Sequence, residues 1–183
     1  DVYCLRPGKY INDNLITEYA QLLMEYAKLS RGPSYPGVRT WIPDTMLLRQ
    51  LKDRKQRGTN DQRLHFVTND LGTNGIQGID LILVPLHVSS NHWVLVVFDM
   101  VPSGLLTTPS TLILDSLGER NLLNWDWETN IELLREYLRL AQAASYPLAT
   151  PMPTNFVAGA PVQSAGEGYM TQTTKGNDCA VFL

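Results

Sequence analysis

The sequence predicts an α+β domain in which helices flank a central sheet. Apolar residues recur at helical spacing in two stretches, 15–29 and 127–145, which predicts two amphipathic helices. Between them, residues 79–88, 92–100 and 110–118 are dense in Val, Ile, Leu and Phe, a composition typical of strands. The short connections allow these strands to be antiparallel neighbours, so we expect a mixed or antiparallel sheet.

Length and composition are those of one folded domain, which we place over residues 1–183. Hydrophobic residues make up 44% of the chain and charged residues 18%, which is too apolar for a chain dominated by disorder. The formal charge is −3 and Lys and Arg are scattered, so no basic surface for nucleic acid is predicted. No apolar run approaches the roughly 20 residues of a membrane span. We therefore expect neither nucleic acid nor a membrane as a partner.

The N-terminal part is predicted to contain two helices. Asn12 and Asp13 can each cap the first, and Asp44 can cap a second helix over residues 45–55. Residues 30–43 contain three Pro and two Gly and are predicted to form a loop. The apolar stripe of the first helix, which we expect to be buried, consists of Leu15, Tyr19, Leu22, Leu23 and Tyr26.

The remaining segments complete the predicted fold. Residues 63–69 are rich in strand formers, and residues 70–78, with Gly72, Gly75 and Gly78, are predicted to form a connection rich in turns. Residues 146–168 contain four Pro and are too long for an ordinary connection, so we expect an insertion or a mobile lid. The helix over 127–145 is predicted to face the sheet with Ile131, Leu134, Leu138 and Ala141.

Few residue types in this chain can perform chemistry. The chain lacks HExxH, CxxC and GxSxG motifs and a phosphate loop, so no metal or cofactor is predicted. Its two cysteines, Cys4 and Cys179, make a poor disulfide framework and favour a reducing compartment such as the cytosol or nucleus. The remaining candidate for a catalytic site is a set made of a Cys, one of the three histidines and an acid.

That set consists of His92, Asp115 and Cys179. A cysteine nucleophile needs an imidazole to take its proton, and the imidazole needs an acid to set its tautomer. His92 begins one predicted strand, and Asp115 ends the neighbouring strand, where an acid can reach the ring. A helix beginning at Cys179 would favour the thiolate. We expect His65 and His87 to lie elsewhere and to be dispensable.

Each of these residues also has an ordinary structural interpretation. A single cysteine is more often a small packing residue, a His at a strand start is often half-buried, and an Asp before Ser-Leu-Gly is often a turn acid. A metal site built from the three is weakly indicated, because no two of them form a local pair. Taken one at a time, the residues therefore do not establish a catalytic site.

Four segments together resemble the landmark motifs of the ubiquitin-like-protein-specific cysteine proteases, the SUMO or sentrin protease family. They occur in the family's order and are "YINDNLI" (10–16), "NHWVLVVFD" (91–99), "LILDSLG" (112–118) and "QTTKGNDCAVF" (172–182). The resemblance implies a papain-like fold and a thiol protease that cleaves after the Gly-Gly terminus of SUMO or a related ubiquitin-like modifier. Such a protease would release the modifier from lysines or trim its precursor. We expect a monomer in the nucleus or cytoplasm.

The same resemblance implies a role for each matched residue. Cys179 would be the nucleophile, His92 the general base and acid, and Asp115 the acid that orients His92. Gln172 would donate a hydrogen bond in the oxyanion hole.

Three further residues are implied in substrate binding. Tyr10 and Trp93 would be the two aromatics that enclose the Gly-Gly tail, and Asp13 would face the modifier.

The chain departs from the family pattern at several positions. Tyr10 replaces the usual Trp, and Ala180 replaces the usual Gly after the nucleophile. Gln172 lies one residue further from Cys179 than is common, so either Gln172 or Thr173 would occupy the oxyanion position. Because the family continues with a helix after the nucleophile, we expect the sequence to be incomplete at its C-terminus.

Two other functions fit the same sequence. The first is a catalytically inactive relative that binds a ubiquitin-like modifier and acts as an adaptor. The second is a cysteine transferase or deamidase of similar fold that ignores the folded modifier. The sequence alone does not distinguish SUMO from Nedd-type or ubiquitin substrates.

Overall fold

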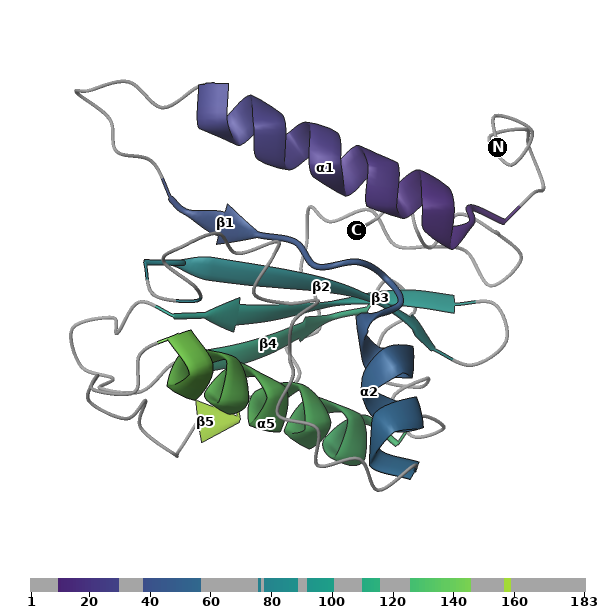
Figure 1. Ribbon diagram of the computed structural model, residues 1–183. Helices are drawn as coiled ribbons and strands as arrows, with labels where there is room; N and C mark the ends of the chain where they lie inside the picture. Colours follow the sequence, from purple (N-terminus) through teal and green to yellow (C-terminus); the bar gives the residue numbers. More distant parts are fainter. Residues whose placement is uncertain are drawn as a thin grey trace, which may run out of the picture.

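The computed structural model describes residues 10–29, 38–56, 76, 78–88, 92–100, 110–115, 126–145 and 157–158. Within these residues, helices lie above and below one sheet in the view of Figure 1. None of the described helices is long and apolar enough to cross a membrane. The helices are α1 (Asp13–Leu29), α2 (Leu47–Gln56) and α5 (Trp127–Ser145), and the strands are β1 (Thr40–Trp41), β2 (Leu81–Val88), β3 (His92–Asp99), β4 (Ser110–Leu114) and β5 (Val157–Ala158).

The sheet is mixed, with the order β1-β2-β3-β4-β5. Its centre is antiparallel, because β3 pairs antiparallel with both β2 and β4, whereas β1 and β5 pair in parallel at the edges. The three central strands confirm the three strands predicted from composition. The two edge strands were missed, since residues 40–41 were predicted as loop and residues 157–158 as part of an irregular segment. Two residues are too few to show a periodic pattern, and their pairing depends on a neighbouring strand.

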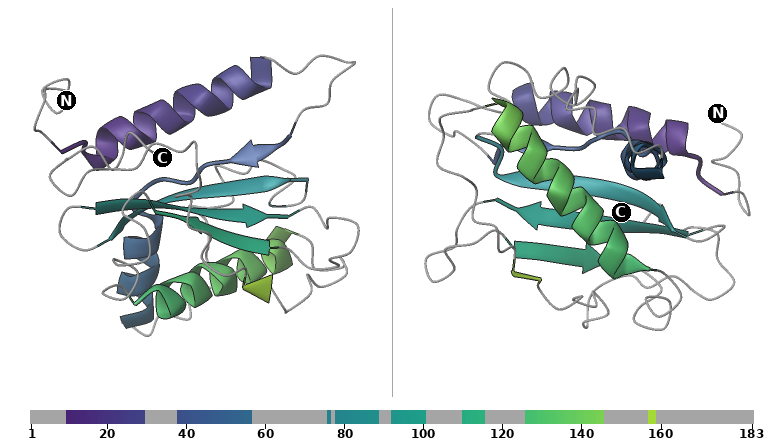
Figure 2. Two further views of the ribbon diagram at one scale, coloured as in Figure 1. Left: turned by 180° about the vertical axis from the view of Figure 1, so that it is seen from behind. Right: turned by 60° about the horizontal axis from the view of Figure 1, so that its bottom comes forward.

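One face of the sheet carries the core. Alternate residues of the central strands point to this face, as the two-residue period of a strand requires. Helix α5 crosses the same face diagonally (Figure 2). The residues of its predicted apolar stripe are buried. The buried apolar residues on this face of the central strands are Ile82, Val84, Leu86, Val88, Val94, Val96, Phe98 and Ile113, and those from α5 include Ile131, Leu134, Leu138 and Ala141.

Helix α2 begins slightly later than predicted. The Asp44 carboxylate accepts a hydrogen bond from the Met46 backbone N–H at 2.6 Å, and the Asp44 carbonyl accepts one from Leu47 at 3.0 Å. These bonds make residues 45–46 a turn that leads into the helix, so Asp44 does act at its start. Leu48 and Leu51 are buried in the same core as α5.

Helix α1 begins as predicted but packs with an unexpected face. The Asn12 side chain accepts a hydrogen bond from the Leu15 N–H at 3.0 Å, which is an N-cap bond to the third helical residue. The predicted stripe is not buried, however, because Tyr19, Leu22 and Tyr26 are 62–71% exposed.

The opposite side of α1, lined by smaller or more flexible residues, contacts the domain. Ala20 is buried, the Thr17 hydroxyl hydrogen-bonds that of Thr45 at 3.2 Å, and the Met24 sulfur accepts a hydrogen bond from the Ile42 N–H. The prediction of one buried stripe was therefore wrong. The helix lies along the β1 edge of the sheet (Figure 1), where small residues allow a close approach.

A tight junction positions the start of β2. Arg39 and Asp80 are joined by backbone hydrogen bonds and by an ion pair of 3.2 Å. Gly78, which lies in the connection predicted to be rich in turns, has a φ of 84°, and a Cβ there would collide with the Arg39 guanidinium. The positive φ favours glycine at this position, whereas the Arg39 side chain could move away from a Cβ.

Several predictions fall on residues that the structure does not describe. They are the strand over 63–69, most of the connection over 70–78, and the lid over 146–168 apart from residues 157–158. The extent of the single domain also stays a prediction.

Candidate active site

The central feature of the candidate site is a buried contact between His92 and Asp115. His92 is the first residue of β3, and Asp115 directly follows β4. In the β3–β4 register Leu95 pairs with Leu114, which places Asp115 beside Val94 and diagonal to His92 on the same face. The His92 Nε2 atom lies 2.7 Å from an Asp115 carboxylate oxygen, and the two side chains are 6% and 5% exposed.

This geometry has a consequence for proton transfer. An ionised carboxylate only accepts hydrogen bonds, so Asp115 favours the His92 tautomer that carries its proton on Nε2. The other ring nitrogen, Nδ1, is then the one suited to accept a proton from a nucleophile. The structure brings together two of the predicted catalytic residues in the arrangement that their proposed roles need.

Trp93 points to the opposite face of the sheet from His92. Its indole N–H donates a hydrogen bond to the Ile11 carbonyl at 3.2 Å, which ties β3 to the segment just before α1. The Trp93 side chain is almost fully buried. This bond therefore connects the first and second of the four sequence motifs in space.

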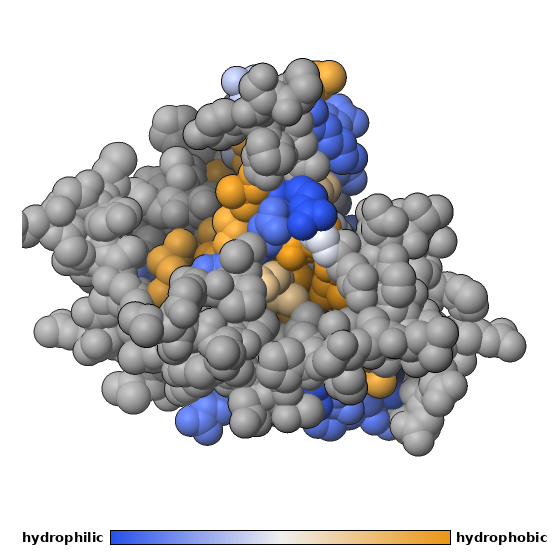
Figure 3. All heavy atoms as spheres, turned by 90° about the vertical axis from the view of Figure 1, so that its left-hand side faces the viewer, coloured by the Kyte–Doolittle hydropathy of each residue, from blue (hydrophilic) through white to orange (hydrophobic). Residues whose placement is uncertain are grey.

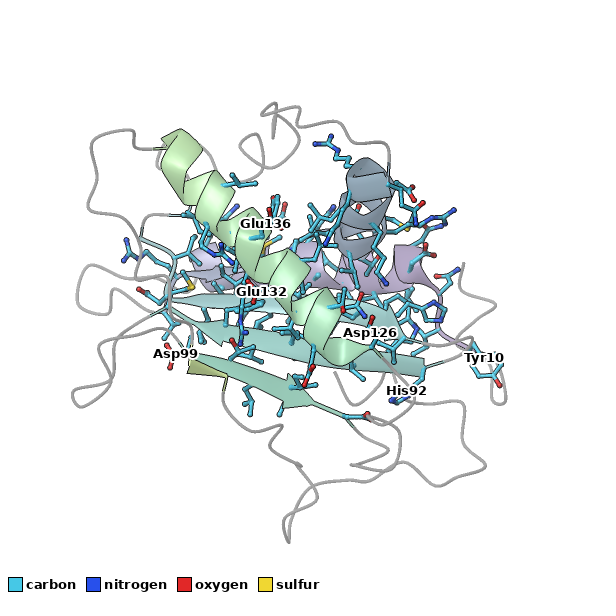
Figure 4. The ribbon with its side chains drawn as sticks, turned by 90° about the horizontal axis from the view of Figure 1, so that it is seen from below. Tyr10, His92, Asp99, Asp126, Glu132 and Glu136 are labelled. Carbon is cyan, nitrogen blue, oxygen red and sulfur yellow. The ribbon has the colours of Figure 1, made fainter. Side chains whose placement is uncertain are left out.

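Tyr10 and Asp13 lie near the same end of the sheet. Figure 4 shows Tyr10 and His92 at one end of the molecule, with Tyr10 projecting outward, and Asp99 toward the other end. Tyr10 is 49% exposed, and the ring contact described for Trp93 is with His87 rather than with Tyr10. The expected enclosure of the Gly-Gly tail by Tyr10 and Trp93 stays a prediction.

A cleft of about 530 Å³ lies between the start of α1, helix α2 and the end of the β2–β3 hairpin. Trp93 and Asp13, two of the residues predicted to bind substrate, line this cleft. Arg49 and Lys52 of α2 add positive charge to its wall. The cleft is therefore a polar space beside the buried indole.

His87 lies on the opposite face of the sheet from His92, in keeping with the expectation that it lies away from the catalytic residues, but its contact with Trp93 was not foreseen. His87 pairs with Trp93 across β2 and β3, and the two ring centroids are 4.8 Å apart. The strands predicted over 79–88 and 92–100 contained a signal for this contact. Only residues 89–91 separate them, and antiparallel pairing of Val88 with His92 places His87 opposite Trp93.

The other half of the predicted site lies outside the described residues. Cys179 and Gln172, with the alternative Thr173, are not among them, so their distances from His92 stay predictions. Within the part of the chain that the structure describes, no group of three or more His, Cys, Asp or Glu side chains could hold a metal ion.

Comparisons with known proteins place these features in context. The sequence pattern of the Ulp1 protease family, C-terminal catalytic domain, matches residues 9–165. No curated protein matches the chain in sequence.

Solved structures are similar over nearly the whole chain, among them the following two. One is the de-sumoylating protease, at 15% identity and a TM-score of 0.64, covering 99% of this chain and 62% of that one. The other is the C-terminal Ulp1 protease domain in complex with Smt3, the yeast ortholog of SUMO, at 18% identity and a TM-score of 0.56, covering 97% and 64%. The chain thus spans less than two thirds of the length of either structure. At these identities the likeness shows the fold, and it confirms the predicted α+β, papain-like class.

Proposed function

The protein belongs to the Ulp1 protease family, as its four motifs predicted, and from this premise we propose that it is a cysteine protease for a ubiquitin-like modifier. Its substrates would be SUMO or a related modifier, joined to a lysine or present as a precursor. Cleavage would follow the modifier's Gly-Gly terminus. The observation that carries this proposal is the buried His92–Asp115 contact of 2.7 Å.

The first step of the proposed reaction forms a thioester. His92 takes the proton of the Cys179 thiol, and the sulfur attacks the carbonyl carbon of the terminal glycine. The amide bond to lysine breaks, and His92 gives the proton to the departing amine. Asp115 supports both transfers because it holds the imidazole and stabilises its charged form.

The second step restores the enzyme. A water molecule gives a proton to His92 and attacks the thioester carbonyl, and the carbon–sulfur bond breaks. The modifier leaves as a free carboxylate, and Cys179 regains its proton. The amide of Gln172, or the hydroxyl of Thr173, would stabilise the negative oxygen in both steps.

Glycine selection is proposed to depend on Trp93. An aromatic ring close to the tail leaves no room for a side chain, so only glycine residues would pass. The indole of Trp93 is held in position, because its N–H donates a hydrogen bond to the Ile11 carbonyl. Asp13 would contact the folded body of the modifier from the start of α1.

The decisive test is a SUMO, Nedd-type or ubiquitin molecule with an electrophile at its C-terminus. We expect a covalent adduct on Cys179, located by mass spectrometry of peptides, and no adduct in Cys179→Ala. The modifier that reacts fastest identifies the preferred substrate. Reversible binding without an adduct would instead support an adaptor, and reaction with small amides alone would support a transferase or deamidase.

A second test addresses the observation that carries the proposal. Replacing the acid in Asp115→Asn is expected to slow cleavage by roughly 10⁴-fold, the effect of neutralising the acid of a comparable triad. Modifier binding should change little, because the Asp115 side chain is buried. Urea unfolding of the same variant controls for loss of fold. An active Asp115→Asn protein with normal stability would contradict the proposed role.

We further propose that the protein acts as a monomer in the nucleus or cytoplasm. Its two cysteines suit a reducing compartment. Microscopy of a tagged protein and sedimentation at several concentrations would test these two points. Secretion or a stable dimer would contradict them.

A further inference from the structure

We propose that His87 is a positioning residue that holds the indole of Trp93 and thereby sets the selectivity for glycine. This inference rests on the proposed function, because it assigns a specificity role at the same site. His87 would act through Trp93 and need not touch the substrate.

The first observation is the direct ring contact across the hairpin. His87 and Trp93 are paired in the β2–β3 register, so both side chains leave the sheet on the same face. Their ring centroids are 4.8 Å apart with an interplanar angle of 40°, within the range of a favourable ring contact. His87 is exposed and Trp93 is 5% exposed, so the imidazole covers part of the indole from the solvent side.

The second observation is that the indole has another restraint at its edge. Its N–H is bonded to the Ile11 carbonyl at 3.2 Å. A hydrogen bond at one atom still allows a ring to tilt about that atom. The contact with His87 adds a restraint against tilting toward the side on which the imidazole lies.

The third observation is the space beside the two rings. His87 and Trp93 both line the cleft of about 530 Å³. If the imidazole were removed, this cleft would extend to the face of the indole that His87 now covers. The indole would then have room to tilt. Its distance from the Gly-Gly tail of a bound modifier would no longer be fixed.

The other charged groups that line the cleft do not replace this contact. Asp13 lies at the start of α1, and Arg49, Lys52 and Asp53 lie on α2. None of them provides a flat ring against Trp93, whereas a phenyl ring at position 87 would. The role therefore predicts that Phe can substitute for His87 and that Ala cannot.

The experiment compares two modifier substrates, with a Gly-Gly tail and with Ala in place of the penultimate glycine. For His87→Ala we expect the ratio of kcat/KM values for the two tails to fall at least tenfold, mainly because the Ala tail is cleaved better. His87→Phe should retain the ratio of the unchanged protein. Leu83→Ala is the matched control, because Leu83 lies on the same face of β2 and pairs with Val97 instead.

A second measurement does not depend on activity. The indole N–H resonance of Trp93, assigned by its loss in Trp93→Phe, should shift or broaden in His87→Ala. It should remain close to its original position in Leu83→Ala. This measurement reports the position of the ring even if no substrate is cleaved.

The outcomes separate the inference from the proposed function. If the unchanged protein cleaves neither tail, the protease proposal fails, and the indole resonance alone decides the role of His87. If the protein is selective and His87→Ala changes neither the ratio nor the resonance, the inference is overturned. Equal changes in His87→Ala and Leu83→Ala would also overturn it, because they would indicate general loosening of the strand.

Discussion

Helices α1 and α5 have the same type of amphipathic sequence, but the predicted apolar stripe is buried in α5 and exposed in α1. Both begin with a capping side chain that bonds the N–H three residues later, Asn12 in α1 and Asp126 in α5. Figure 4 shows Asp126 at the start of α5. Both carry apolar residues at helical spacing, yet the predicted stripe is at most 2% exposed in α5 and largely exposed in α1.

The difference arises from what each helix packs against. Helix α5 crosses the broad face of the sheet (Figure 2). Large apolar side chains of the helix and the sheet are buried together there. Helix α1 lies beside the short strand β1 and contacts the domain through Thr17, Ala20 and Met24. In the space-filling view, apolar surface reaches the exterior on the side where α1 ends (Figure 3). Periodicity thus identifies the helix and its stripe, but does not say which face is covered.

The largest effect is expected where the stripe is buried. Leu134→Ala in α5 should lower the free energy of unfolding by about 2–5 kcal/mol, because it leaves a cavity in the core. Urea unfolding followed by circular dichroism would measure the loss. A cost below about 1 kcal/mol would mean that α5 is not packed as described.

The next effect concerns the small inner face of α1. Ala20→Leu should cost about 1–3 kcal/mol, because the added side chain must fit where the helix meets the domain. The same unfolding measurement applies. Stabilisation by this substitution would indicate that α1 rotates to bury its larger residues, which would remove the contrast with α5.

Removal of the capping side chain should have a similar effect on stability in the two helices. Asn12→Ala and Asp126→Ala should each cost about 1 kcal/mol, because each removes an acceptor from an N–H in the first turn. Parallel urea titrations of the two variants would compare them. A large effect at one cap and none at the other would show that tertiary contacts, and not local bonds, determine where that helix begins.

The smallest effect is expected on the outer face of α1. Leu22→Gln should change the free energy of unfolding by no more than about 0.5 kcal/mol, because Leu22 is 63% exposed and Gln is a good helix former. Thermal and urea unfolding should agree. A loss above about 1 kcal/mol would show that this face is covered in solution.

The part of the candidate site that could be predicted is the pair of residues placed by the ends of two neighbouring strands. His92 and Asp115 were expected to meet because each lies at the end of one of two neighbouring strands, and the β3–β4 register does bring them together. The contact between His87 and Trp93 was missed because the sequence showed His87 only as one of three histidines. The exact strand register was needed to place it opposite Trp93.

The sequence by itself determined the three central strands, the three helices and the capping residues of the first two helices. These features depend on side-chain periodicity and on hydrogen bonds between residues at most four positions apart. Only the tertiary structure decided that residues 40–41 and 157–158 join the sheet, which face of α1 is covered, and which ring contacts Trp93. The first two depend on contacts between distant segments, and the third on the exact register of two strands, none of which local periodicity encodes.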